Sequence, residues 1–168
     1  MNKLLIICLC AGLFVACKKS DGDAVQVKAQ AGIDDKLIAD YISANGINAT
    51  KVMVGRLDTT GVWYVVSNPG SGNTLITSSS LLTVGYTGRI LKTGKVFTQT
   101  DAFHPSYSLG NMIKGWQLGL TAAKIKKGAK VRLLIASRYA YGPYDQPTLG
   151  IPGNSVLDFD IELFDVTN

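Results

Sequence analysis

One short helix-like stretch, set among runs that read as strands, constrains the fold more than any other feature of this sequence. Residues 112–119 (MIKGWQLG) are entered from a loop and place Trp116 in the first turn of a helix. Because a sheet must bury one face against another element, this pattern predicts an α+β fold, a mostly antiparallel sheet curled around one short helix. A ligand pocket would then lie between helix and sheet, lined by aromatic side chains.

The flanking elements follow from local patterns. Residues 33–45 read as an N-terminal helix, with Asp34 as its N-cap, Asp35 near its positive end and Asn45-Gly46 as its stop. The short central helix is expected to end near Ala123, and residues 99–106 and 137–155 read as loops. Strands are expected over 51–57 and 62–67, paired as a hairpin, and over 81–91, 95–98, 131–136 and 156–166.

Composition excludes several classes of site. The chain has 168 residues, 46% of them hydrophobic and 17% charged, which suits one domain, or two at most, with a buried core. The net charge of +5 comes from largely scattered basic residues, so we expect no nucleic-acid partner. His104 is the only histidine, and no cysteine follows Cys17. We therefore expect no metal, no cofactor and no disulfide scaffold.

The first seventeen residues predict export and lipidation. Lys3 is followed by an apolar run over 4–15 that is too short to span a bilayer and fits the core of a secretory signal. Ala16-Cys17 then resembles the lipobox of bacterial lipoproteins, which implies cleavage after residue 16 and acylation of Cys17. The alternative is an ordinary signal peptide with a chance cysteine. Residues 17–32 have no apolar period and read as a flexible tether.

Seven short pieces, in order and with consistent spacing, resemble the FKBP-type peptidyl-prolyl cis-trans isomerases. The resemblance spans about residues 81–166, roughly half of the chain. The pieces are 84–88 (VGYTG), 93–97 (TGKVF), 108–110 (SLG), 112–116 (MIKGW), 139–142 (YAYG), 150–152 (GIP) and 156–163 (VLDFDIEL). The resemblance implies an FKBP-like domain over 50–168, preceded by a helical extension over 33–49 like those of bacterial FKBP-type lipoproteins. Lys18, directly after the lipidated cysteine, implies delivery to the outer membrane, on its periplasmic or its exposed face.

The resemblance also implies a proline pocket that acts on proline-containing polypeptides. Its catalytic residues would be Tyr141, Phe97 and Ile113, with the Tyr141 hydroxyl and the Ile113 N–H donating hydrogen bonds to the ligand. Its other substrate-binding residues would be Tyr86, Met112, Trp116, Ile151 and Phe159, with Trp116 as the floor. Isomerisation of an X-Pro bond needs no nucleophile and no metal, because the barrier is the loss of amide resonance.

Two departures from the family pattern leave alternatives open. Thr98 follows Phe97 where the family usually has Asp, and Pro105 falls where a pocket aromatic is common, so that Phe103 would have to substitute from a shifted loop. Residues 142–150 also differ locally, which predicts an altered peptide preference. The first hypothesis is a membrane-anchored isomerase that assists folding of envelope or secreted proteins. The alternatives are a binding or chaperone module on the same fold, or aromatics that serve only as core. Neither the client proteins nor the oligomeric state can be predicted.

Overall fold

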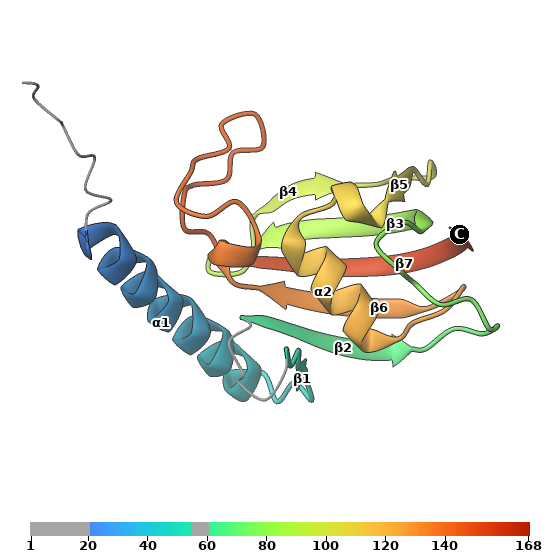
Figure 1. Ribbon diagram of the computed structural model, residues 1–168, viewed down its shortest axis with the longest axis horizontal. Coiled ribbons are helices and arrows are strands. Elements are labelled where there is room, and N and C mark those ends of the chain that lie inside the picture. The colour runs from blue at the N-terminus through green and yellow to red at the C-terminus, as the bar shows by residue number, and fades with distance from the viewer. Residues whose placement is uncertain (1–20, 55–60) are drawn as a thin grey trace, which may run out of the picture.

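The computed structural model describes residues 21–54 and 61–168, which form one curved antiparallel sheet with helices packed against it (Figure 1). The sheet order is β1-β2-β6-β7-β3-β4, with β5 paired to β3. Its strands are β1 (Thr50–Lys51), β2 (Val62–Asn68), β3 (Leu81–Ile90), β4 (Val96–Gln99), β5 (Ser106–Ser108), β6 (Lys130–Ile135) and β7 (Leu157–Thr167). The helices are α1 (Asp21–Ala44) and α2 (Lys114–Ala123), with short 3-10 turns η1 (Leu109–Asn111) and η2 (Ser137–Tyr139).

The predicted fold class is confirmed: an antiparallel sheet, one short helix across it, and an N-terminal helix. Helix α2 ends at Ala123 as expected but begins at Lys114, because Met112 and Ile113 keep extended backbone angles. The hairpin pairing is also confirmed by the registers Thr50↔Tyr64 and Lys51↔Trp63. Part of its predicted turn lies at 55–60, outside the described residues.

Two strand predictions were wrong in detail. Residues 52–54 do not continue β1, since Met53 and Val54 turn toward solvent and are 57% and 51% exposed. The loop expected over 99–106 is confirmed for residues 100–105, but Ser106 begins β5, a strand that was not predicted and that pairs with the start of β3 through Thr83↔Ser106. That pairing needs a partner strand far away in the sequence, so no local pattern revealed it.

Helix α2 covers one face of the sheet and makes the main core. Val131, Leu133 and Ile135 of β6 alternate with residues of the opposite face, as a strand requires, and pack in the same cluster as Trp116. Gly115 and Gly119 allow the helix to lie close to this strand, because a Cβ at either position would stand 2.3 Å from Ile135 or 2.7 Å from Leu133. The spacing of the two glycines therefore fixes how deeply Trp116 is inserted.

Helix α1 packs on the opposite face, near one end of the sheet (Figure 1). Ile38 is fully buried there in a second cluster with Leu91, Leu134, Ala136 and Val156. Arg132 of β6 donates to the Tyr41 hydroxyl at 2.8 Å and so joins the helix to the sheet. The N-terminal helix is thus attached to the domain by buried apolar and polar contacts.

The predicted start of this helix was wrong. Helix α1 begins at Asp21, so residues 21–32 of the expected tether are helical. Ala, Gln and Lys are good helix formers, and most side chains over 25–33 are exposed, which is why this part has no apolar period. Asp34 lies inside the helix and is not its N-cap.

The expected signal peptide, Cys17 and the start of the tether lie outside the described residues. Within the described part of the chain, neither helix is long and apolar enough to span a membrane.

Candidate functional site

The ring of Trp116 meets two other aromatic rings at right angles between α2 and the sheet. The Trp116 ring lies edge to face with Tyr86 of β3, at 5.4 Å and 88°, and with Phe159 of β7, at 5.4 Å and 86°. Trp116 is 1% exposed, and its Nε1 has no hydrogen-bond partner in the described part of the chain. Such edge-to-face contacts fix ring positions, so Trp116 forms a rigid base for the cluster.

Phe97 of β4 extends the cluster toward the edge of the sheet. Its ring stands at 90° to Phe159, with centroids 5.6 Å apart. Gly88 of β3 makes room for this pair, because a Cβ at position 88 would lie 2.7 Å from Phe159 and 2.8 Å from Phe97. Gly88 belongs to the motif 84–88, but the sequence analysis gave it no role in the site; in the structure it lies opposite Thr98 of β4.

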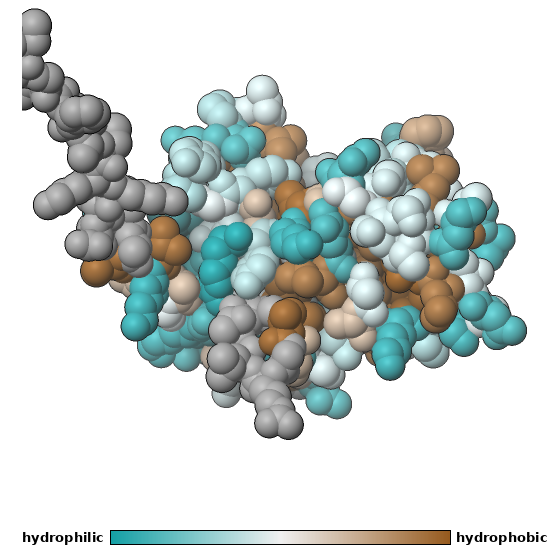
Figure 2. Space-filling view, in the orientation of Figure 1, coloured by the Kyte–Doolittle hydropathy of each residue, from teal (hydrophilic) through white to brown (hydrophobic). Residues whose placement is uncertain are grey.

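The structure brings all eight predicted pocket residues into the same hydrophobic cluster. Trp116, Phe159 and Ile151 are buried, whereas the other five are half-buried and form a rim: Tyr86, Phe97, Met112, Ile113 and Tyr141. Apolar surface is accordingly visible among polar side chains on the α2 side of the molecule (Figure 2). A buried base with a half-buried aromatic rim suits a small apolar ring as ligand.

Two hydrogen-bond donors at this rim are unpaired within the described residues. Ile113 is the N-cap of α2, and its carbonyl accepts the Trp116 N–H at 3.0 Å, but its own N–H has no acceptor there. The Tyr141 hydroxyl likewise has no hydrogen-bond partner among residues 21–54 and 61–168. Burial raises the pKa of this hydroxyl above its ordinary value of 10.0, and the nearby Tyr86 raises it further. The hydroxyl therefore stays protonated and able to donate at neutral pH.

Tyr107 of β5 is a member of the rim that the sequence analysis missed. Its hydroxyl lies 3.4 Å from that of Tyr86, and the two ring centroids are 6.3 Å apart. Hydrogen bonding to Tyr86, followed by burial, raises the pKa of Tyr107. The alternative that Phe103 substitutes for Pro105 was wrong, because Phe103 is 74% exposed. Tyr107 lies in β5, two residues after Pro105, and an aromatic residue so near in the sequence was the available signal.

Polar chemistry at this site is sparse. Thr98 is half-buried beside Phe97 and offers a hydroxyl without a charge. Among residues 21–54 and 61–168, no three His, Cys, Asp or Glu side chains are grouped so as to hold a metal ion. The arrangement can hold an apolar ring, exclude water from it and offer two hydrogen-bond donors, the Ile113 N–H and the Tyr141 hydroxyl, to a bound ligand.

Two other concavities are present, and of the eight predicted pocket residues only Tyr86 lines either of them. One, of about 560 Å³, is on the sheet face opposite α2, where His104 stacks on Phe164 with centroids 3.8 Å apart. The other, of about 670 Å³, runs between α1 and the long loop after β6, and is lined by Val27, Ile33 and Tyr144 among others. Neither one contains the unpaired donors or the Trp116 base.

Comparison with known proteins gives consistent results. Residues 72–164, just over half of the chain, match the model of the FKBP-type peptidyl-prolyl cis-trans isomerase family. The chain is 40% identical over 102 residues to FK506-binding protein 1 of Saccharomyces cerevisiae, an alignment that covers 59% of this chain and 87% of the yeast protein. It is 32% identical over 154 residues to a probable FKBP-type peptidyl-prolyl cis-trans isomerase of Haemophilus influenzae, covering 90% of this chain but only 58% of that relative's length. The crystal structure of a peptidyl-prolyl cis-trans isomerase from Pseudomonas syringae pv. tomato matches with a TM-score of 0.66 and 26% identity, over 84% of this chain and 96% of that one.

Proposed function

This chain belongs to the family of FKBP-type peptidyl-prolyl cis-trans isomerases, and we propose that its aromatic cluster around Trp116 is the site that binds and isomerises proline. The observation that carries this proposal is the coincidence of a buried base, a half-buried aromatic rim and two unpaired donors. In this assignment Tyr141, Phe97 and Ile113 act on the reacting bond. Tyr86, Met112, Trp116, Ile151 and Phe159 hold the proline ring.

The chemistry required is rotation about one amide bond. The barrier of about 18–20 kcal/mol is the loss of resonance on twisting the C–N bond. The planar ground state is strongly dipolar, so an apolar, water-poor site disfavours it relative to the twisted form. Donors on Ile113 and Tyr141 orient the flanking carbonyl, which converts binding energy into correct geometry. No covalent intermediate is formed and no cofactor is needed.

We further propose that the enzyme acts on proteins of a bacterial envelope. The support is in the sequence: the short apolar run over 4–15 is followed by Ala16-Cys17, a small residue before a cysteine, which resembles a lipobox. Acyl chains on Cys17 would anchor the chain stably, since several chains bind membranes far more firmly than one. Lys18 favours the outer membrane, and the substrates would then be proline-containing segments of envelope or secreted proteins.

A binding or chaperone module with weak catalysis is the second candidate. Thr98 favours it, because a carboxylate that the family usually places beside the pocket is absent. The absence of a pocket aromatic at Pro105 is a weaker argument for this candidate, because Tyr107 of β5 supplies an aromatic ring to the rim.

The test is refolding of a model protein whose slow step is proline isomerisation, with the full chain as catalyst. Wild type should accelerate the slow phase, and the double variant Tyr141→Phe with Phe97→Ala should lose that acceleration while remaining folded. Suppression of aggregation of a proline-free client is the companion measurement. Activity in the second assay alone would favour the binding module and remove the isomerase proposal.

A further inference from the structure

A buried carboxylate outside the aromatic cluster is not used by the mechanism above. Asp34 of α1 is 1% exposed, and its oxygens accept three hydrogen bonds. The Gln30 amide donates at 2.8 Å, and Ser137 donates from its backbone N–H at 2.9 Å and from its hydroxyl at 2.6 Å. Burying a charge is costly unless hydrogen bonds compensate it, so this cluster is a specific, fully paired arrangement.

Ser137, the residue that Asp34 holds, is itself the anchor of the Tyr141 turn. Ser137 begins η2 and is 2% exposed. Its carbonyl accepts the N–H of Ala140 at 2.9 Å and the N–H of Gly142 at 2.8 Å. These two donors flank Tyr141 on either side in the sequence. The path from Asp34 to the Tyr141 backbone therefore passes through a single residue.

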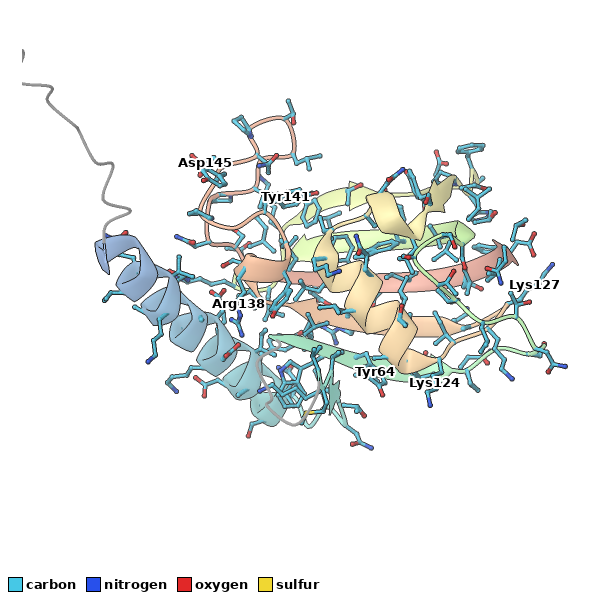
Figure 3. All side chains as sticks on the ribbon, in the orientation of Figure 1. Tyr64, Lys124, Lys127, Arg138, Tyr141 and Asp145 are labelled. Carbon is cyan, nitrogen blue, oxygen red and sulfur yellow. The ribbon has the colours of Figure 1, made fainter. Side chains whose placement is uncertain are left out.

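A second contact ties the same turn to α1. Arg138 donates to Asp35 at 2.7 and 3.0 Å and to the Ala31 carbonyl at 3.3 Å. Figure 3 shows Arg138 between α1 and the base of the loop that carries Tyr141. The carboxylate of Asp35 is 39% exposed, so solvent weakens this ion pair, whereas the hydrogen bonds of Asp34 are buried. Beyond the two ties, the 670 Å³ groove separates helix and loop.

We propose that Asp34 is a positioning residue for the isomerase reaction, which sets the Tyr141 hydroxyl through Ser137. The proposal rests on the function assigned above. In this proposal α1 contributes to catalysis. Its Asp34 carboxylate accepts from both the N–H and the hydroxyl of Ser137 and so fixes that residue. The turn that follows Ser137 then positions the Tyr141 hydroxyl at the proline site. Rate depends steeply on such placement, because a reacting geometry tolerates little displacement.

The experiment measures kcat/KM of the full chain on a short proline peptide, with a protease-free assay, at a temperature well below the Tm of every variant. Asp34→Ala is expected to lower kcat/KM by about 3- to 5-fold through misplacement of the Tyr141 donor, and by no more than deletion of the hydroxyl itself does. Asp34→Asn keeps one acceptor and should fall between that variant and wild type. Asp40→Ala is the matched control: it removes an exposed acid of the same helix, which pairs only with Lys36, and should leave kcat/KM unchanged.

A double-mutant cycle with Tyr141→Phe separates positioning from general stability. If Asp34 acts through the hydroxyl, Asp34→Ala should cost less than about twofold in the Tyr141→Phe background, since the group it places is gone. An additive loss, or wild-type kcat/KM in Asp34→Ala, would overturn the proposal. If Asp34→Ala does not fold, the same cycle with Asp34→Asn and Ser137→Ala decides by the same criteria. A wild-type chain without activity would instead reject the proposed function.

Discussion

The rings of Phe97 and Phe159 meet at 90°, with centroids 5.6 Å apart, directly beside the α-carbon of Gly88. Phe97 comes from β4 and Phe159 from β7, and Gly88 belongs to β3, which separates these two strands in the sheet. The absent side chain of the middle strand is thus what allows the outer two rings to touch. Removing that space should disturb the site without changing any residue that contacts the ligand.

Gly88→Ala is the first prediction. The added methyl would stand 2.7–2.8 Å from Phe159, Phe97 and Thr98, so at least one ring has to move. We expect a loss of about 1–3 kcal/mol of unfolding free energy, typical of overpacking, and a lower kcat/KM for proline peptides. Gly32→Ala is the control, since a Cβ there meets nothing within 4 Å. Denaturant titration and isomerase kinetics on both variants check this; equal behaviour of the two would contradict it.

The second prediction concerns pH. Burial raises the pKa of Tyr141 above 10.0, so the folded protein holds this proton more tightly than the unfolded chain does. Its contribution to stability is therefore present below the unfolded pKa and is lost as pH rises through the higher folded value. For the same reason, kcat/KM should stay level up to about pH 10 and fall only above it.

The control for this pH profile is Tyr141→Phe. Its kcat/KM should be lower by about fivefold throughout, the equivalent of one hydrogen bond of about 1 kcal/mol. The drop caused by loss of the Tyr141 proton should also disappear from its profile. A fall in wild-type kcat/KM that is centred near neutral pH would show that another group controls the rate.

The third prediction tests the face opposite α2. Arg132 donates to both oxygens of Asp158 at 2.8 Å, and this pair raises the pKa of Arg132. Asp158 is 4% exposed, whereas the Arg132 side chain is 27% exposed. Asp158→Ala leaves a partly buried guanidinium without its carboxylate, and we expect a loss of about 2–4 kcal/mol, discounted for solvent access.

Glu162→Ala is the comparison for that variant. Glu162 pairs with Lys130 at 3.3 Å, and both side chains are at least 40% exposed, so the loss should be below about 1 kcal/mol. Denaturant midpoints measure both variants. Similar losses would mean that burial does not set the strength of these pairs.

Features of this chain that depend on neighbouring residues were predictable from the sequence, whereas those that depend on contacts between distant elements were not. Most strands were predictable because alternation and turn residues are read from neighbouring residues, and Trp116 was correctly expected to enter the core. The length of α1 was not predictable, because side chains over 25–33 are mostly exposed and so show no periodic pattern of buried apolar residues. Asp34 was misread as an N-cap because its partner, Ser137, lies 103 residues away. Which acceptor a buried donor finds is decided by packing between elements.

The last prediction concerns the membrane anchor proposed at Cys17. Only a thiol can form the thioether to a diacylglyceryl group, so Cys17→Ser should abolish acylation while leaving the domain over 50–168 unchanged. Expressed in a Gram-negative host, wild type should sediment with membranes and take up labelled fatty acid, and the variant should be released or left unprocessed. Cys10→Ser is the matched control, because that cysteine lies within the expected signal sequence and should not alter fractionation. Membrane fractionation with label retained in Cys17→Ser would refute the lipid assignment. If Cys17→Ser loses both membrane fractionation and the fatty-acid label but keeps isomerase activity, the anchor is independent of the catalytic site.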